Sequence, residues 1–333
     1  MITVLIPTFN RPHLLRVALE SIAKQTYLSY IDKVIVSENG LNNSSSQVCA
    51  EFSQLNIQYV YQEEQLPVLK HIQWLMSLEA NGYVAFLCDD DWWNIYHIEL
   101  AVNSLKKYPD NVSYFSDFLF ASNDKSLEFS IYNNAKFLAS RNNKYVNYDL
   151  FFLKTEDIIF SSVLVTPFHF SALVCNANIL SKVAYIFDEV HPTYSDRMLW
   201  VVLSSYGGFI FNPLPTTVIR NHAEQDSNNY SSLEWRNNNQ AGSLQVLLFS
   251  EEKNIDVKGM INDAYVLGNS EERMNINQEM ERVFVNRDNI IWYKGYNDII
   301  AVDQQKLKIE YEKKIYEASV KYKLIKFARK CFK

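Results

Sequence analysis

Residues 2–24 read ITVLIPTFNRPHLLRVALESIAK, and this stretch decides the fold class. Its first part, 2–6, is apolar and β-branched and ends at a proline, which is typical of a short strand followed by a turn. From Pro12 onward the apolar residues recur every three or four positions, which predicts a helix over 12–24. A strand followed by a helix is the unit from which α/β sheets are built.

The same alternation continues along the next part of the chain. It predicts strands at 34–40, 57–61 and 83–87 and a second helix at 67–80. Strands that alternate with helices indicate an α/β fold with a mostly parallel, doubly wound central sheet.

Polar residues concentrate where three of these strands end. The segments are PTFNRP (7–12), ENG (38–40) and DDDWW (89–93). In a doubly wound sheet, ligands bind at the carboxyl ends of the strands. We therefore expect the functional site at these three segments.

Beyond about residue 110 the pattern is less regular. We predict strands at 113–120, 170–176 and 207–213, helices at 177–186 and 195–206, and further helices from about 233. Residues 121–165 are rich in asparagine with aromatic interruptions, and we interpret them as loops over the site.

The composition excludes several classes of protein. The chain has only 8 glycines in 333 residues, and they spell neither G-x-G-x-x-G nor G-x-x-x-x-G-K-[ST], so a glycine-rich phosphate cradle is excluded. A bound phosphate must then be neutralised by another route. The 48% hydrophobic and 21% charged residues indicate a globular protein. Its four cysteines form no C-x-x-C pair, which argues against a zinc knuckle or a disulfide framework.

Charge and hydropathy bear on location and partners. No apolar run approaches the ~18–20 residues of a membrane span, and no secretory signal is recognisable, so we expect a cytoplasmic protein. The net charge is −6, although residues 304–333 carry ten Lys or Arg against three Glu. The acidic remainder argues against nucleic-acid binding. The basic segment has helical apolar spacing, which fits either peripheral contact with the inner face of the cell membrane or a surface helix packed on the body or on a second subunit of a homo-oligomer.

Three consecutive aspartates, 89–91, directly follow the predicted strand 83–87 and precede two tryptophans. Adjacent carboxylates repel one another unless a cation holds them. A solvated acidic loop is the alternative, but such a loop does not require an apolar strand before it. A divalent cation with oxygen ligands, holding the diphosphate of a nucleotide, explains the triplet better.

Together, ITVLIPTFNRP, VIVSENG and YVAFLCDDDWW resemble the family 2 glycosyltransferases, which have the GT-A fold. The resemblance covers about residues 1–225 and implies a catalytic domain there, with a nucleotide-binding half at about 1–115 and an acceptor-binding half at about 116–225. Residues 226–333 would then be a mostly helical C-terminal region that ends in a basic amphipathic helix.

By this resemblance, the nucleotide part of a sugar donor lies across the first two strand ends. Glu38 takes the place of the usual aspartate that contacts the base, and Lys70 lies where the family often has a basic residue near the nucleotide. The other residues that would bind the nucleotide-sugar are Pro7, Thr8, Asn10, Arg11, Asp89 and Asp90.

The resemblance also implies a metal site for Mn²⁺ or Mg²⁺, in one of two registers. If Cys88 replaces the family's first aspartate, Asp90 is the principal ligand, with Asp89 near the ribose and Asp91 in support. If the motif is a plain D-x-D, Asp89 and Asp91 form the pair. His222 follows an arginine at the position where a family histidine completes the metal shell.

The catalytic base of an inverting member would be Asp196, which opens the predicted helix 195–206. An aspartate there has a second interpretation, since acids favour the first turn of a helix. The side chains that would line an acceptor pocket are Trp92, Trp93, His169 and His191.

These expectations describe an inverting, metal-dependent glycosyltransferase. It would move a sugar from a nucleotide donor, UDP-linked by expectation, to a hydroxyl of a glycan or lipid-linked glycan in bacterial surface-polysaccharide biosynthesis. The alternatives are a nucleotidyltransferase of similar fold, whose glycine-rich entry loop is missing, and a catalytically inactive glycan-binding or scaffold protein.

Overall fold

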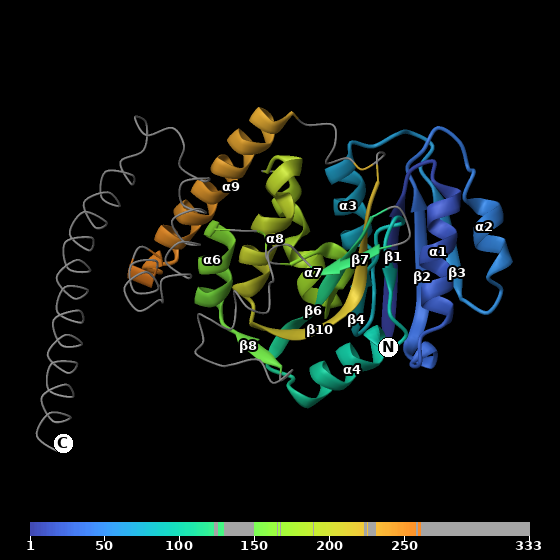
Figure 1. Cartoon of the computed structure of the whole chain (residues 1–333), viewed down its shortest axis with the longest axis horizontal. Coiled ribbons are helices and arrows are strands. Elements are labelled where there is room, and N and C mark those ends of the chain that lie inside the picture. Colours follow the sequence, from blue (N-terminus) through green and yellow to red (C-terminus); the bar gives the residue numbers. More distant parts are fainter. Residues whose placement is uncertain are drawn as a thin grey trace, which may run out of the picture. The chain divides into compact units, whose positions relative to one another are not determined.

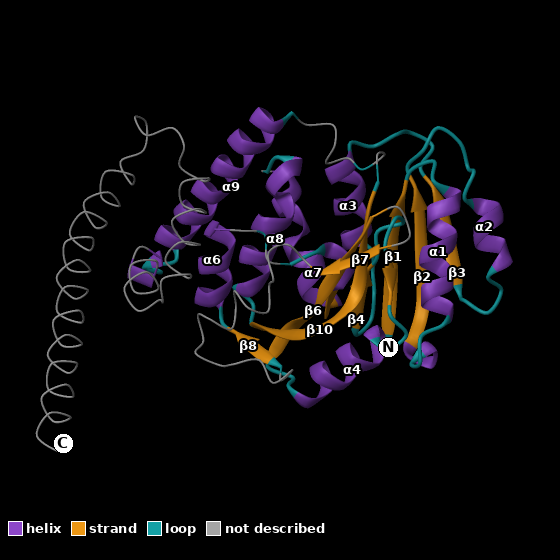
Figure 2. Cartoon of the chain, viewed as in Figure 1, coloured by secondary structure: helices purple, strands orange, loops and turns teal. Residues whose placement is uncertain are grey.

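The structure is a computed structural model, and it describes residues 1–122, 126–129, 150–164, 166, 168–188, 190–222, 225, 231–257 and 259–260. In this part of the chain a central sheet is flanked by helices, which confirms the α/β prediction (Figures 1 and 2). The strands are β1 (Ile2–Thr8), β2 (Ile31–Glu38), β3 (Ile57–Tyr61), β4 (Tyr83–Phe86), β5 (Trp92–Trp93), β6 (Asn111–Ser122), β7 (Ser126–Phe129), β8 (Phe151–Leu153), β9 (Leu173–Asn176) and β10 (Gly208–Asn221). The α-helices are α1 (Pro12–Ala23), α2 (Ser46–Glu51), α3 (Val68–Ser77), α4 (His97–Lys107), α6 (Thr155–Leu164), α7 (Ala177–Val183), α8 (Ser195–Ser204) and α9 (Ser232–Glu252). The 3-10 helices are η1 (Leu28–Tyr30), η2 (Phe170–Ala172), η3 (Ala184–Asp188) and η4 (Pro192–Tyr194).

The sheet is parallel in one half and mixed in the other. Its strand order is β3-β2-β1-β4-β9-β6-β10-β5, with β7 paired to β6 and β8 to β10. Strand β1 runs parallel to β2 and β4, whereas β9 is antiparallel to both β4 and β6. Because β1, β2 and β4 are parallel, their carboxyl ends meet at one edge of the sheet, as the sequence analysis expected.

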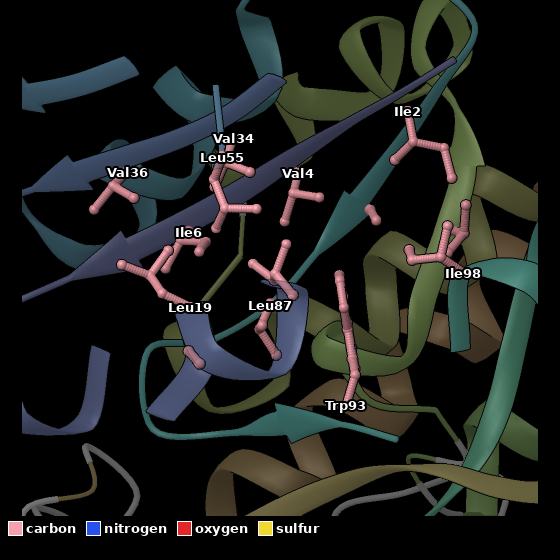
Figure 3. Close-up of a cluster of buried hydrophobic side chains, with 14 of the residues drawn as sticks. Ile2, Val4, Ile6, Leu19, Val34, Val36, Leu55, Leu87, Trp93 and Ile98 are labelled. Carbon is pink, nitrogen blue, oxygen red and sulfur yellow. The ribbon is translucent and has the colours of Figure 1, made fainter. Parts of the chain in front are cut away.

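The main core lies around β1 (Figure 3). Alternate residues of this strand, Ile2, Val4 and Ile6, are fully buried and pack with Val34 of β2 and Leu19 of α1. Side chains two apart in a strand point to one face, so three apolar residues of β1 bind the covering helix to the sheet. Fully burying each contributes about 1.5–3 kcal/mol.

Strand β10 is longer than the predicted strand 207–213, since it extends to Asn221. Pro213 and Pro215 lie within this longer strand, although proline lacks the N–H that a strand ladder needs. The pairing of β10 with β6 shifts register between Asn212 and Thr217 and then resumes. A bulge of this kind allows the strand to pass the prolines and carry its last residues to the carboxyl edge.

The interpretation of 121–165 as loops is wrong for most of its described residues, which form the end of β6, all of β7 and β8, and helix α6. In helix α6 every residue from 158 to 163 is buried, the polar Ser161 and Ser162 included, so this part of the helix has no exposed face. A helix that is buried all round shows no amphipathic period in its sequence.

The expected helix from about 233 is present as α9. It begins with a capping box, in which the Ser231 hydroxyl and the Glu234 carboxylate each bond the other's backbone N–H. Helix α9 packs against α6 and α8 (Figure 1). The basic segment 304–333 lies outside the described residues. None of the described helices is both long enough and apolar enough to cross a membrane.

Candidate active site

Asp89 is held by the end of β1. The Thr8 hydroxyl donates to its Oδ2 at 2.7 Å, and the Arg11 guanidinium donates to Oδ1 at 2.7 Å and to Oδ2 at 3.2 Å. The side chain of Asp89 is only 1% exposed. Both carboxylate oxygens are thus bound by protein donors.

Asp91 is enclosed from the opposite side. Its Oδ2 accepts from the Ser171 hydroxyl at 2.5 Å, and its Oδ1 accepts from the backbone N–H of Arg220 at 3.0 Å. The His169 ring lies 3.7 Å away, but its Nδ1 accepts the backbone N–H of Ser171. Burial lowers the pKa of His169 to about 4, so this ring is neutral and makes no ion pair with Asp91.

Asp90 is the most accessible of the three aspartates, with 13% of its side chain exposed. Its Oδ2 lies 3.3 Å from Nη1 of Arg11 and 3.1 Å from Nε2 of His222. Its backbone carbonyl accepts from Nε of Arg220, whose guanidinium stacks 5.1 Å from the centre of the Trp92 ring. The structure therefore brings Arg11, Asp90 and His222 together.

His222 directly follows strand β10, which brings it to this cluster. This strand pairs with β5, so that Val218 lies opposite Trp92 and Thr217 opposite Trp93. This pairing places the end of β10 beside the aspartates, although His222 is 132 residues from Asp90.

The donor set suits a hard divalent cation. One ligand atom each of Cys88, Asp90 and Asp91 lies within 4.8 Å of the others, and His222 adds an imidazole on Asp90. Carboxylate oxygens with an imidazole fit Mn²⁺ or Mg²⁺. Cys88 is partly buried, and burial raises the pKa of its thiol, which disfavours a thiolate ligand at this position.

The carboxylates also crowd negative charge into a buried space. Burial is the main cause that raises the pKa values of Asp89 and Asp91, and the charge of Asp90 adds to it. The Arg11 guanidinium opposes the shift at Asp89. A second cation at Asp90 would relieve the remaining repulsion.

The ends of β1 and β2 interlock through Asn10. Its backbone is left-handed, with φ of 53°, and its Oδ1 accepts the backbone N–H of Leu41 at 3.2 Å. A Cβ on Gly40 would lie 2.2 Å from this oxygen, so a larger residue there would have to displace the Asn10 side chain. Pro7 lies within β1, opposite Ser37 of β2.

The side chain of Glu38, which we expected to contact the base, is enclosed by the protein. This residue ends β2 as predicted, but its side chain is 0% exposed and its carboxylate is bound by Tyr59, Ser44 and Ser45. Three protein donors thus hold this carboxylate, two on Oε2 and one on Oε1.

Two further predicted residues contact side chains other than the three aspartates. Lys70 is exposed on α3 and pairs with Asp188, which also accepts from Gln73 at 2.7 Å. His191 is exposed beside the Tyr194 ring.

Trp93 does not line an acceptor pocket, and that prediction is wrong. Its side chain is 3% exposed and stacks on His97, with ring centres 4.6 Å apart, and its indole N–H donates to the Ser171 carbonyl. Pairing with β10 turns this ring into the core. Trp92 remains partly exposed beneath Arg220.

Asp196 lies in the first turn of α8, where it is partly buried. Burial raises the pKa of its carboxyl to about 6, against the opposing effects of the Arg197 backbone N–H, 2.7 Å away, and of the Arg197 charge. Such a carboxyl is ionised at pH 7 and still basic enough to accept a proton.

Sequence reasoning missed Ser171 and Tyr59, which bind Asp91 and Glu38. Neither residue stands in a motif. Their roles come from contacts between distant segments, so no local signal could have revealed them.

Comparison with known proteins shows the family of this chain. The model of the family described as Glycosyl transferase family 2 matches residues 3–173, and the chain belongs to this family. The protein is therefore a glycosyltransferase by family, as the sequence resemblance predicted.

Individual relatives match parts of the chain. Glycosyltransferase GlyA of Streptococcus pneumoniae serotype 4 is 27% identical over 132 residues, a match that covers 39% of this chain but only 18% of GlyA. Among solved structures, residues 1–349 of S. aureus TarS align with a TM-score of 0.54 at 14% identity, covering 86% of this chain and 73% of that one. The same segment in complex with UDP-GlcNAc gives a TM-score of 0.55 at 14% identity, covering 86% and 74%. This likeness shows the fold, which is the GT-A fold of glycosyltransferases.

Proposed function

We propose that this protein transfers a sugar, with inversion, from a UDP-linked donor to a hydroxyl of a glycan or lipid-linked glycan, with Mn²⁺ or Mg²⁺ as cofactor. The observation that carries the proposal is the position of Asp90. It is the most exposed of the three aspartates and lies between the side chains of Arg11 and His222, at the edge where β1 and β4 end. The TarS segment crystallised with UDP-GlcNAc and with UDP supports a nucleotide-sugar donor for this chain as well.

The metal would be held by Asp90 and His222, with Asp91 behind them. Asp89 would orient Arg11 toward the donor, since it accepts two hydrogen bonds from that guanidinium. A cation bound there would neutralise the negative charge that grows on the departing diphosphate.

Asp196 would act as the base. The acceptor oxygen forms a bond to the anomeric carbon, the bond from that carbon to the diphosphate oxygen breaks, and the acceptor proton passes to the Asp196 carboxylate. Direct displacement of this kind inverts the anomeric centre and requires an ionised carboxylate at the acceptor hydroxyl.

Release of nucleoside diphosphate tests the proposal. We expect the purified protein with Mn²⁺ to release it slowly from one member of a panel of nucleotide-sugars, without acceptor. Asp90→Asn should abolish donor binding, whereas Asp196→Asn should keep donor binding and lose transfer.

A matched control is Asp32→Asn, an exposed acid at the start of β2, at the opposite edge of the sheet. It should behave as the unaltered protein. Absence of both release and metal-dependent nucleotide binding across the panel would refute the function, and full activity of Asp90→Asn would refute the metal site.

We extend the proposal to the arrangement of the chain. Residues 1–225 would form the catalytic domain, and the basic segment 304–333 would contact the inner face of the membrane, where a lipid-linked acceptor of surface-polysaccharide synthesis is found. Full-length protein should then sediment with anionic liposomes, and deletion of 304–333 should abolish this. Equal sedimentation of both would contradict the membrane contact.

A further inference from the structure

The Glu38 carboxylate at the end of β2 is enclosed by three donors from two other segments. Its Oε2 accepts the Tyr59 hydroxyl at 2.7 Å and the Ser45 backbone N–H at 2.9 Å, and its Oε1 accepts the Ser44 hydroxyl at 3.2 Å. Burial is the largest cause that raises the pKa of Tyr59, and the hydrogen bond to Glu38 is the next, so this hydroxyl stays protonated and remains a donor.

These contacts tie strand β3 to the turn that follows β2. Tyr59 lies in the middle of β3, and Ser44 and Ser45 precede α2. Glu38 is therefore the one residue in this group that contacts both segments. Without its carboxylate, the turn at 44–45 would lose two of the hydrogen bonds that position it.

The adjacent residues of the β2 end are fixed in the same manner. The Asn39 side chain donates to the Leu66 carbonyl and accepts the Leu66 backbone N–H, each at 2.8 Å. Its own backbone N–H donates to the Thr8 carbonyl at 3.0 Å. Through Thr8, which donates to Asp89, the β2 end is connected to the carboxylate cluster.

We propose that Glu38 is a positioning residue, which with Tyr59 shapes the turn 39–45 that forms the base pocket, and that it does not contact the nucleotide base itself. The inference rests on the proposed function, since it concerns the donor pocket of that site. A glutamate has one more methylene than the family's usual aspartate, and this added length carries the carboxylate to Tyr59 and Ser45. The residues of the turn 39–45, and not the Glu38 carboxylate, would then contact the base and select it.

Binding of two nucleotides distinguishes positioning from direct contact. UDP carries an N3–H that a carboxylate in contact with the base would accept, whereas CDP has none. The affinities of the full-length protein for UDP and CDP are measured by calorimetry with Mn²⁺. The ratio of the two affinities then measures how strongly the protein distinguishes uracil from cytosine. The variants are Glu38→Asp, Glu38→Gln and Tyr59→Phe, and Tyr83→Phe at the start of β4 serves as the matched control.

We expect Glu38→Asp, Glu38→Gln and Tyr59→Phe each to weaken UDP and CDP binding in parallel, by about tenfold, with their ratio unchanged, since hydrogen bonds to a charged group position the turn. Tyr83→Phe should bind both as the unaltered protein does. Thermal unfolding identifies any variant that fails to fold. Ser44→Ala then replaces that variant, because it removes only one donor at the partly exposed turn, and it should weaken UDP and CDP binding in parallel by a smaller factor.

Two results would refute this inference without refuting the proposed function. One is a changed ratio of UDP affinity to CDP affinity in Glu38→Gln, and the other is unaltered binding of both nucleotides by Tyr59→Phe. Stronger UDP binding by Glu38→Asp would likewise indicate direct contact. Absence of nucleotide binding by the unaltered protein would instead refute the proposed function, and the inference with it.

Discussion

Asp89, Asp90 and Asp91 are neighbours in the chain, but each has a different environment. Asp89 is bonded to Thr8 and Arg11, and Asp91 to Ser171 and the Arg220 backbone. Both are 1% exposed, whereas Asp90 keeps an accessible oxygen beside His222. The accessibility of each carboxylate thus depends on single hydrogen-bond donors.

Ser171→Ala should destabilise the protein by about 1.5–3 kcal/mol, because it removes a donor from the buried Asp91 carboxylate and the acceptor of the Cys88 N–H. Urea unfolding measures the loss. Ser181→Ala is the control, since this exposed hydroxyl bonds only a carbonyl of its own helix among the contacts described. Equal stabilities of the two variants would contradict the role of Ser171.

The rate of transfer should depend on pH through Asp196. Burial raises the pKa of its carboxyl to about 6, and a base acts only when ionised. We therefore expect kcat to fall by about tenfold per pH unit below pH 6 and to level off above it. Asp196→Asn should lose this pH dependence, and its kcat should fall by about 10²–10⁴-fold. A midpoint near pH 4 would indicate an ordinary exposed carboxyl, or a different base.

At the scale of elements, helices α6, α8 and α9 are joined by one buried cation. The guanidinium of Arg197, on α8, donates to the Ser243 hydroxyl of α9 at 2.7 Å, and that hydroxyl donates to the Val163 carbonyl of α6 at 2.8 Å. Arg197 is next to Asp196, so this junction also fixes the first turn of α8.

Ser243→Ala should therefore lower the free energy of unfolding more than replacement of another serine in α9 does. We expect about 1.5–3 kcal/mol from denaturant unfolding, because the hydrogen bond of a buried charged group is lost. The matched control is Ser250→Ala, equally buried, whose hydroxyl bonds only the Leu247 carbonyl within the same helix among the contacts described. The junction is refuted if the two substitutions have equal effects.

At the scale of the whole molecule, the carboxyl edge of the sheet gathers residues from the ends of β1, β4 and β10. Arg11 and Asp90 are 79 residues apart in the chain, and Asp90 and His222 are 132 apart. Only the strand order, with β10 paired to β5, brings the three together.

A ligand bound at this edge should stabilise the folded protein. With Mn²⁺ and UDP at about 100 times the dissociation constant, we expect about 2.7 kcal/mol of added stability, seen as a rise in Tm. The rise should vanish with EDTA and in Asp90→Asn. A rise that persists in EDTA would show that nucleotide binding does not require the metal.

The sequence by itself determined the α/β class, the four strands and two of the three α-helices up to residue 87, with α2 missed, and the three polar segments at the strand ends. These features are local, since hydrophobic spacing and turn residues act over a few neighbouring positions. The family followed from the same segments and was confirmed by the match over 3–173. Helix α6 was missed for the same reason, because its residues 158–163 are buried on all sides and show no local period.

Only the tertiary structure decided which aspartate is accessible, that Glu38 is enclosed, and that the Trp93 ring lies in the core. Each outcome depends on a partner far along the chain: Ser171 is 80 residues from Asp91, and Tyr59 is 21 residues from Glu38. Burial and hydrogen bonding are properties of the packed chain, so residues of one chemical type in one motif acquire different roles only when distant segments surround them.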